Sequence, residues 1–116
     1  HVDHSYEVGV ETHCGLPLCC RKTSGAPKSK ETTSGKWGDY QCDLNPLTLQ
    51  NLVEFVSEEI KPDAVLWGGD SIPHDVAAQT FDEVIEFMTK TTSIFTEGLE
   101  WSTKIYPTIG NHDTFP

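Results

Sequence analysis

The chain has 116 residues, with 8 Lys and Arg against 18 Asp and Glu, a formal net charge of −10, and 36% hydrophobic residues. This length fits one domain at most. The sequence contains no apolar run of about 18 residues, so we expect no membrane-spanning segment. The acidic balance also argues against a stable nucleic-acid partner, because proteins that bind nucleic acid neutralise its phosphates with a basic face.

The charge divides the chain into two regions. Residues 1–42 carry five basic and five acidic side chains and contain all four cysteines, whereas residues 43–116 carry three basic and thirteen acidic side chains. The first region is rich in Gly, Ser, Thr, Pro and Lys, and the second has the hydrophobic periodicity of regular structure. We therefore expect a loop region over 1–44 and an α/β segment over 45–116. The Lys-rich stretch 21–36 is expected to be a solvated loop, with contact with an anionic lipid surface as the alternative.

The four cysteines, Cys14, Cys19, Cys20 and Cys42, allow three disulfide connectivities. The connectivity that joins Cys19 to Cys20 is disfavoured, because adjacent residues cannot reach the usual disulfide geometry without strain. Two connectivities stay open: Cys14–Cys19 with Cys20–Cys42, or Cys14–Cys20 with Cys19–Cys42. Disulfides would place the protein in an oxidising compartment. The alternative is a structural zinc site, but the spacing lacks the paired C-x2-C motifs that are typical of one.

A helix and a strand are predicted at the start of the second region. Asn45 is a suitable N-cap and Pro46 a suitable first residue for a helix that ends before Pro62. The apolar residues of this helix fall on one face, at Leu49, Leu52, Val53, Val56 and Ile60. The short apolar run 64–67 then has the pattern of a buried parallel strand.

A second helix and a second strand complete the pattern. The helix is predicted from about Gln79 to Phe95, with acidic residues in its N-terminal half, where the helix dipole favours them. Its inward-facing residues are predicted to be Val84, Ile85, Met88, Thr92 and Phe95. Residues 104–109 are predicted to form the second strand, in which Pro107 is tolerated at an edge or end.

A polar turn follows each predicted strand. Gly68-Gly69-Asp70 follows the first, and Gly110-Asn111-His112-Asp113 follows the second. A right-handed β-α-β crossover makes the two strands parallel, so both end at the edge of the sheet where α/β proteins bind ligands. We therefore expect the carboxylate of Asp70, the amide of Asn111 and the imidazole of His112 to meet there. This set of ligands suits zinc, iron or manganese.

These turns resemble the second and third motifs of the calcineurin-like metallophosphoesterases, whose first motif is Asp-x-His. His1 looks like the His of that first motif, so the chain looks like a piece of a longer protein. Further blocks are similar in order and spacing to acid sphingomyelinases: residues 1–6, 14–21, 37–44, 69–76 and 106–112. The resemblance implies an incomplete α/β/β/α sandwich, with a parallel βαβ core preceded by a disulfide-stapled loop region, as the N-terminal part of a catalytic domain. It also implies the pairing of Cys14 with Cys19 and of Cys20 with Cys42.

The resemblance also implies roles for five residues. His1, Asp70 and Asn111 would be metal ligands for two zinc ions, with Asp70 bridging both ions. His112 would be the catalytic residue that protonates the leaving alcohol or stabilises charge in the transition state, and both His112 and His74 would lie at the substrate phosphate. Structural roles are the alternatives: Asp70 as a helix cap, Asn111 as a left-handed turn residue, and His74 as a cap at a helix entry.

The activity implied for the parent protein is zinc-dependent hydrolysis of sphingomyelin to ceramide and phosphocholine. Two alternatives stay open: an acid sphingomyelinase-like phosphodiesterase that acts on soluble nucleotide or choline-phosphate esters, and a secreted binding module without catalysis. The family also requires later Gly-His and Gly-His-x-His motifs, which this chain lacks. We therefore expect the isolated segment to bind zinc weakly and to have little or no activity. The resemblance places the parent protein outside the cell or in the lysosome.

Overall fold

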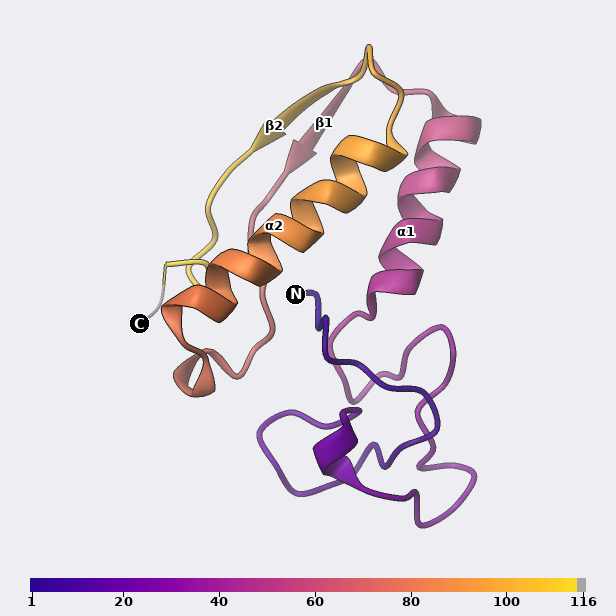
Figure 1. Ribbon diagram of the computed structural model, residues 1–116. Helices are drawn as coiled ribbons and strands as arrows, with labels where there is room; N and C mark the ends of the chain where they lie inside the picture. Colours follow the sequence, from indigo (N-terminus) through magenta and orange to yellow (C-terminus); the bar gives the residue numbers. More distant parts are fainter. Residues whose placement is uncertain (115–116) are drawn as a thin grey trace.

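The structure is a computed structural model that describes residues 1–114. Its longer elements are helix α1 (Pro46–Phe55), strand β1 (Ala64–Trp67), helix α2 (Phe81–Gly98) and strand β2 (Lys104–Pro107). Helix α1 continues as a turn of π-helix, η2 (Val56–Ile60), and two short 3-10 helices are η1 (Lys22–Ser24) and η3 (Val76–Ala78). The chain before α1 is almost entirely loop and lies beyond the first turn of that helix (Figure 1). The described part is thus a small α/β unit with a loop region attached.

Helix α1 begins and ends as the sequence predicts. The side chain of Asn45 accepts a hydrogen bond from the backbone N–H of Thr48 at 2.8 Å, and Pro46 is the first helical residue. Lys61 adopts a left-handed conformation after η2 and ends the helical segment just before Pro62. On the predicted apolar face, Leu49 and Val53 are buried and Val56 is half-buried, whereas Leu52 and Ile60 are exposed.

Helix α2 starts two residues later and ends three residues later than predicted. Thr80 is its N-cap and forms a capping box with Glu83, in which each side chain binds the backbone N–H of the other residue. The helix ends at Gly98, where an added Cβ would lie only 2.6 Å from Cγ1 of Val53 in α1. Glycine at this position lets the end of α2 pack closely against α1.

The buried face of α2 differs from the predicted face at two positions. Ile85 and Thr92 are exposed, whereas Val84 and Thr91 are buried. Thr91 can be buried because its hydroxyl donates a hydrogen bond to the carbonyl of Ser71. The prediction placed Thr92 on the inward face and missed the neighbouring Thr91, because periodicity does not report the distant carbonyl to which Thr91 is bonded.

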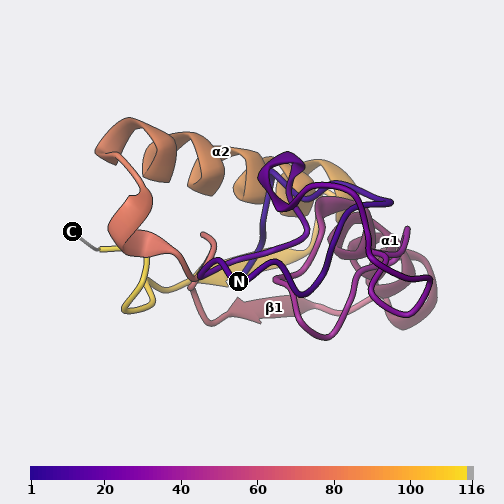
Figure 2. The same ribbon diagram turned by 90° about the horizontal axis from the view of Figure 1, so that it is seen from below.

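The two strands form a parallel sheet in which Ala64 pairs with Lys104 and Trp67 pairs with Pro107. The second strand is shorter than predicted and ends at Pro107, although the N–H of Thr108 still donates to the carbonyl of Trp67 at 2.9 Å. Helix α2 lies along one side of this sheet (Figure 2). The predicted β-α-β order is therefore confirmed, and both strands end at the same edge.

A small core joins the helices, the sheet and the start of the chain. Its buried members are Val2, Leu49, Val53 and Leu99, and half-buried side chains from both helices and both strands pack around them. Val2 reaches this core because its segment bridges to Leu44, just before α1. The N-terminus consequently lies near the middle of the molecule (Figure 1).

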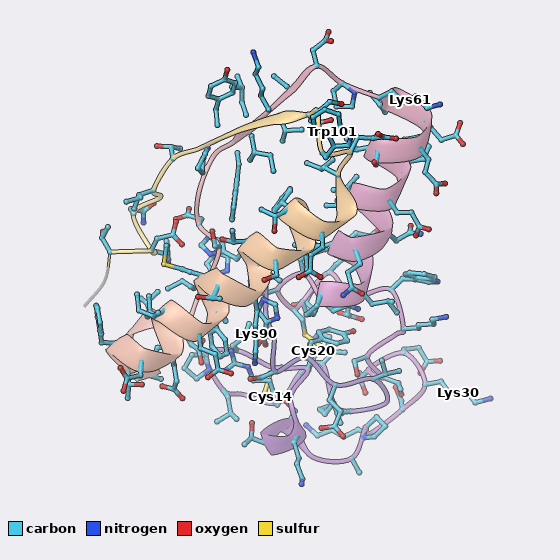
Figure 3. The ribbon with its side chains drawn as sticks, turned by 45° about the horizontal axis from the view of Figure 1, so that its top comes forward. Cys14, Cys20, Lys30, Lys61, Lys90 and Trp101 are labelled. Atoms are coloured by element: carbon cyan, nitrogen blue, oxygen red, sulfur yellow. A yellow bond between two sulfur atoms is a disulfide. The ribbon has the colours of Figure 1, made fainter. Side chains whose placement is uncertain are left out.

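Two disulfides hold the loop region. Cys14 is bonded to Cys19 and Cys20 to Cys42, with Cα–Cα distances of 5.7 and 6.1 Å. This is the pairing that the family resemblance implies, and it is one of the two that the residues alone left open. Cys14 and Cys20 lie in the loop region, below α2 in the view of Figure 3. Over residues 1–114, no helix combines the length and hydrophobicity needed to cross a membrane.

Candidate active site

The turns that follow β1 and β2 are in direct contact. The backbone N–H of His112 donates a hydrogen bond to Oδ1 of Asp70 at 3.0 Å. A Cβ added at Gly69 would collide with the backbone nitrogen of Gly110, and one added at Gly110 would collide with the carboxylate of Asp70. Two glycines therefore allow the strand ends to approach closely enough for their polar side chains to share one site.

Asp113 joins the two turns. Its carboxylate accepts three backbone hydrogen bonds, from Asp70 at 2.7 Å, Ser71 at 2.7 Å and Gly110 at 2.9 Å. The side chain is nearly buried, which strengthens these charge-assisted bonds. The sequence shows Asp113 as part of the second turn, but no pattern in it predicts this role. The signal that could have found it is the need of two tight turns for a common acceptor.

Asp70 has a left-handed backbone with φ of +54°, which is uncommon for a residue with a side chain. Its carboxylate faces the second turn and does not cap a helix, since the N-cap of α2 is Thr80. Strained residues of this kind occur at functional sites when surrounding bonds hold them in place. Here the bonds from Asp113 and His112 do so.

His1 lies against Asp70. Its Nδ1–H donates to the carbonyl of Ile72 at 2.8 Å, and its Nε2 lies 3.6 Å from Oδ2 of Asp70. Because a carbonyl can only accept, the proton is assigned to Nδ1 and the lone pair of the neutral ring to Nε2. The available ring nitrogen of His1 and a carboxylate oxygen of Asp70 therefore point toward the same space.

Three imidazoles gather at this point. The ring centroid of His1 lies 3.5 Å from that of His74 and 4.5 Å from that of His112, and the last two are 5.3 Å apart. Nδ1 of His112 is buried and has no hydrogen-bond partner within residues 1–114. The structure thus brings His1, Asp70, His74 and His112 together from three separate segments.

His74 is oriented by Asp43. The backbone N–H of His74 donates to Oδ2 of Asp43 at 2.8 Å, and its Nδ1 donates to Oδ1 at 2.5 Å. Asp43 is nearly buried, while the imidazole of His74 is half-exposed and its ring is tilted by 42° against that of His1. Asp43 is not predicted as a site residue, because it lies 31 residues from His74 and no sequence pattern connects the two.

Asn111 lies in the second turn between Gly110 and His112, and its side chain is exposed. Its φ is not positive, so the left-handed turn role is not observed. The structural alternative for His74 is not observed either, because the short helix η3 has no side-chain cap.

The donors at this edge fit a divalent metal ion in part. A histidine whose Nδ1–H is bound to a carbonyl and whose Nε2 faces a carboxylate has the arrangement that is common among metal-bound histidines. Within the part of the chain that the structure describes, no three His, Cys, Asp or Glu side chains are arranged to hold a metal ion. Imidazole, carboxylate and amide oxygen are nevertheless ligand types that zinc accepts.

Known proteins match the chain over its whole length. It is 39% identical over 118 residues to sphingomyelin phosphodiesterase B of Dictyostelium discoideum, of which it covers 18%. It is 37% identical over 117 residues to human sphingomyelin phosphodiesterase, of which it again covers 18%. The chain is homologous to the sphingomyelin phosphodiesterases. It is also 34% identical over 120 residues to acid sphingomyelinase-like phosphodiesterase 3b of the mouse, covering 24% of that protein.

The homology to sphingomyelin phosphodiesterases confirms the resemblance derived from the motifs. The chain spans about a fifth of the length of the curated relatives it matches. No protein-family model matches the chain.

Proposed function

We propose that the protein is a metal-dependent phosphodiesterase that hydrolyses sphingomyelin to ceramide and phosphocholine, and that this chain supplies one part of its catalytic site. One observation carries the proposal: His1, Asp70 and His112 converge at the carboxyl ends of two parallel strands. The chain in which they converge is homologous to sphingomyelin phosphodiesterases throughout. In this proposal the two-stranded unit is part of a metallophosphoesterase sandwich.

The proposed metal ligands are His1, Asp70 and Asn111, and the proposed metal is zinc. Asp70 suits a bridging position because a carboxylate offers two oxygens with several lone pairs, whereas Asn111 offers one neutral oxygen. When bound, zinc would lower the pKa of a water molecule and neutralise charge on the phosphoryl group. The remaining ligands would come from parts of the protein outside this chain.

The histidines then act on the phosphodiester itself. His112 is the proposed proton donor to the leaving alkoxide, because an imidazole can carry and release a proton near neutral pH. Its backbone is fixed by the bond to Asp70, so its ring is held beside the proposed ligands. His74, held by Asp43, is proposed to bind a phosphate oxygen. Its Nδ1–H is occupied by Asp43, so Nε2 is the nitrogen available to the substrate.

The disulfides support a further part of the proposal, which is location. Two disulfides in a small loop region are typical of proteins that fold in an oxidising compartment. We therefore propose that the protein is located outside the cell or in the lysosome. Expression with and without the oxidising secretory route, followed by mass spectrometry of the cysteine peptides, tests this.

The activity is tested on the full-length protein with sphingomyelin in vesicles and with a soluble nitrophenyl phosphodiester. We expect hydrolysis of sphingomyelin, loss of that activity after chelation, and recovery with added zinc. Asp70→Asn should lower kcat/KM by more than about a hundredfold, because it removes the proposed bridging charge. Asp63→Asn, at an exposed carboxylate beside β1, is the matched control and should change kcat/KM less than twofold. Hydrolysis of the soluble ester alone would favour the sphingomyelinase-like alternative, and hydrolysis of neither would overturn the proposal.

A further inference from the structure

Arg21 is held between two carboxylates from distant parts of the chain. Its Nε and Nη2 donate to Asp3 at 2.7 and 3.1 Å, and its Nη1 and Nη2 donate to Asp75 at 2.5 and 3.1 Å. The side chains of Arg21, Asp3 and Asp75 are 18, 1 and 13% exposed, so this is an interior cluster. Burial lowers the pKa of Arg21, but the bonds to Asp3 and Asp75 outweigh it and raise the pKa above its ordinary value.

The cluster lies next to the residue that orients the substrate phosphate in our proposal. Asp75 directly follows His74, so Arg21 and Asp43 form hydrogen bonds with two consecutive residues of the same loop. Arg21 and Asp43 each directly follow a cysteine of the same disulfide, since Arg21 follows Cys20 and Asp43 follows Cys42.

The Cys20–Cys42 disulfide therefore links the two chain segments whose side chains bind this loop. In the first segment Arg21 binds Asp75, and in the second Asp43 binds His74. Cys20 is fully buried and has a left-handed φ of +61°, so the backbone is tightly fixed directly before Arg21. Cys20 is also bonded through its carbonyl to the N–H of Glu7 at 2.7 Å. The disulfide thus holds the backbone in place next to both Arg21 and Asp43.

Removing the guanidinium would leave Asp3 and Asp75 facing each other with no cation between them. Two buried carboxylates repel each other, and an unpaired buried charge is costly. Asp3 is fixed in place, because its other contacts include the backbone N–H of Ser5. Asp75 would consequently move outward, and the adjoining His74 would move with it, away from Asp43.

We propose that Arg21 is a positioning residue for His74: through Asp75 it fixes the loop so that the imidazole stays on Asp43 and faces His1 and His112. This inference rests on the proposed function, in which His74 binds the substrate phosphate. In this role Arg21 keeps the loop of His74 and Asp75 in position, and its guanidinium does not contact the substrate. Lysine cannot replace it, because a point charge cannot bridge two carboxylates with paired bonds.

The test uses the full-length protein and a double-mutant cycle with His74→Ala. Arg21→Lys should lower kcat at least tenfold in the wild-type background and less than twofold in the His74→Ala background, with zinc content little changed and kcat measured at a temperature at which every variant is folded. Asp75→Asn is the second variant and should also lower kcat only where His74 is present, because the amide leaves Arg21 one acceptor oxygen in place of two. Glu86→Gln, which removes one partner of the exposed Lys90–Glu86 pair, is the control and should change kcat less than twofold. Equal losses in both backgrounds, or no loss in an active enzyme, would overturn the inference.

A readout without activity separates this inference from the proposed function. Carbethoxylation of each histidine by diethyl pyrocarbonate is followed by mass spectrometry, with the exposed His13 as internal reference. Arg21→Lys should speed modification of His74 at least threefold relative to His13, because the ring is released from Asp43. An unchanged ratio would overturn the inference whether or not the wild type hydrolyses sphingomyelin. A changed ratio in a protein without hydrolytic activity would support the positioning role and count against the proposed function alone.

Discussion

Gly68 and Gly69 are neighbours in one turn, but only Gly69 is needed for the approach of the two strand ends. Gly69 has φ of +82°, and a Cβ there would meet the backbone of Ile109 and Gly110. Gly68 has an ordinary φ and open space around its Cα. The two positions therefore provide a matched pair in which only one substitution disturbs the site.

Gly69→Ala should lower the free energy of unfolding by about 1–3 kcal/mol, because the methyl group forces the turns apart and its φ is unfavourable for alanine. It should also lower kcat/KM strongly, since His112 would lose its contact with Asp70. Gly68→Ala should change both quantities little. Denaturant unfolding and steady-state kinetics of the two variants check this, and equal effects would contradict the steric account.

A second prediction at the residue scale concerns Asp113. Asp113→Asn should destabilise the protein by about 1–3 kcal/mol, because one amide oxygen cannot accept all three backbone N–H groups and a buried donor is left unpaired. Thermal unfolding measures the loss. Asp39→Asn, at a carboxylate outside the site that accepts one backbone N–H in an exposed turn, is the control and should cost less. A fully stable Asp113→Asn variant would show that the turns are held by other contacts.

At the scale of elements, helix α2 carries the crossover between the strands and depends on its N-terminal cap. Thr80→Ala should destabilise the protein by about 1 kcal/mol, because the hydroxyl that accepts the N–H of Glu83 is lost. Thr96→Ala in the same helix is the matched control, since Thr96 binds only carbonyls of its own helix and alanine favours helix. Denaturant unfolding should show a loss for the first variant and little change or a gain for the second.

The N-terminal segment is joined to α2 by His4, whose Nε2 lies 2.9 Å from the hydroxyl of Thr91. Burial, followed by the charge of Lys90, lowers the pKa of His4, while Asp3 and Glu86 act more weakly in the opposite direction. The unfolded chain therefore binds more protons than the folded chain between the folded pKa and the ordinary value of 6.5. This contribution to stability is present above pH 6.5 and is lost as the pH falls through that window.

His4→Asn should therefore flatten the decrease in the free energy of unfolding from pH 7.5 to pH 5. Urea unfolding of wild type and variant at several pH values measures the two slopes. Identical slopes would show that protonation of His4 is not linked to folding.

At the scale of the whole molecule, the two disulfides staple a loop region that contributes little to the apolar core. The Cys20–Cys42 bridge spans 22 residues and the Cys14–Cys19 bridge spans 5. Loop-closure entropy assigns about 3 kcal/mol to the longer bridge and about 2 kcal/mol to the shorter one.

Replacing both cysteines of the longer bridge by serine should therefore destabilise the protein more than the same change at the shorter bridge. It should also lower activity further, because the longer bridge lies next to Asp43 and Arg21, which bind His74 and Asp75. Denaturant unfolding and kinetics of the two double variants compare them. A larger effect at Cys14–Cys19 would contradict this order.

The sequence by itself determined the order and type of the elements in residues 45–114. Local signals suffice for the longer elements: Asn45 before Pro46 starts a helix and an apolar run forms β1, although β2 ends at Pro107 and not at residue 109 as predicted. Because a β-α-β crossover makes the strands parallel, the pattern also predicted that Asp70 and His112 would follow neighbouring strand ends. The disulfide pairing came from family resemblance, since geometry left two choices.

Only the tertiary structure decided which residues hold the site. The side chains of Asp113, Asp43 and Arg21 bind partners 18 to 54 residues away, except for the short contact of Asp113 with Gly110. Periodicity reports which side of an element faces the core, but it does not report which distant donor a buried carboxylate will meet. The same reason explains the misplaced face of α2, where Thr91 can be buried because its hydroxyl donates a hydrogen bond to the carbonyl of Ser71.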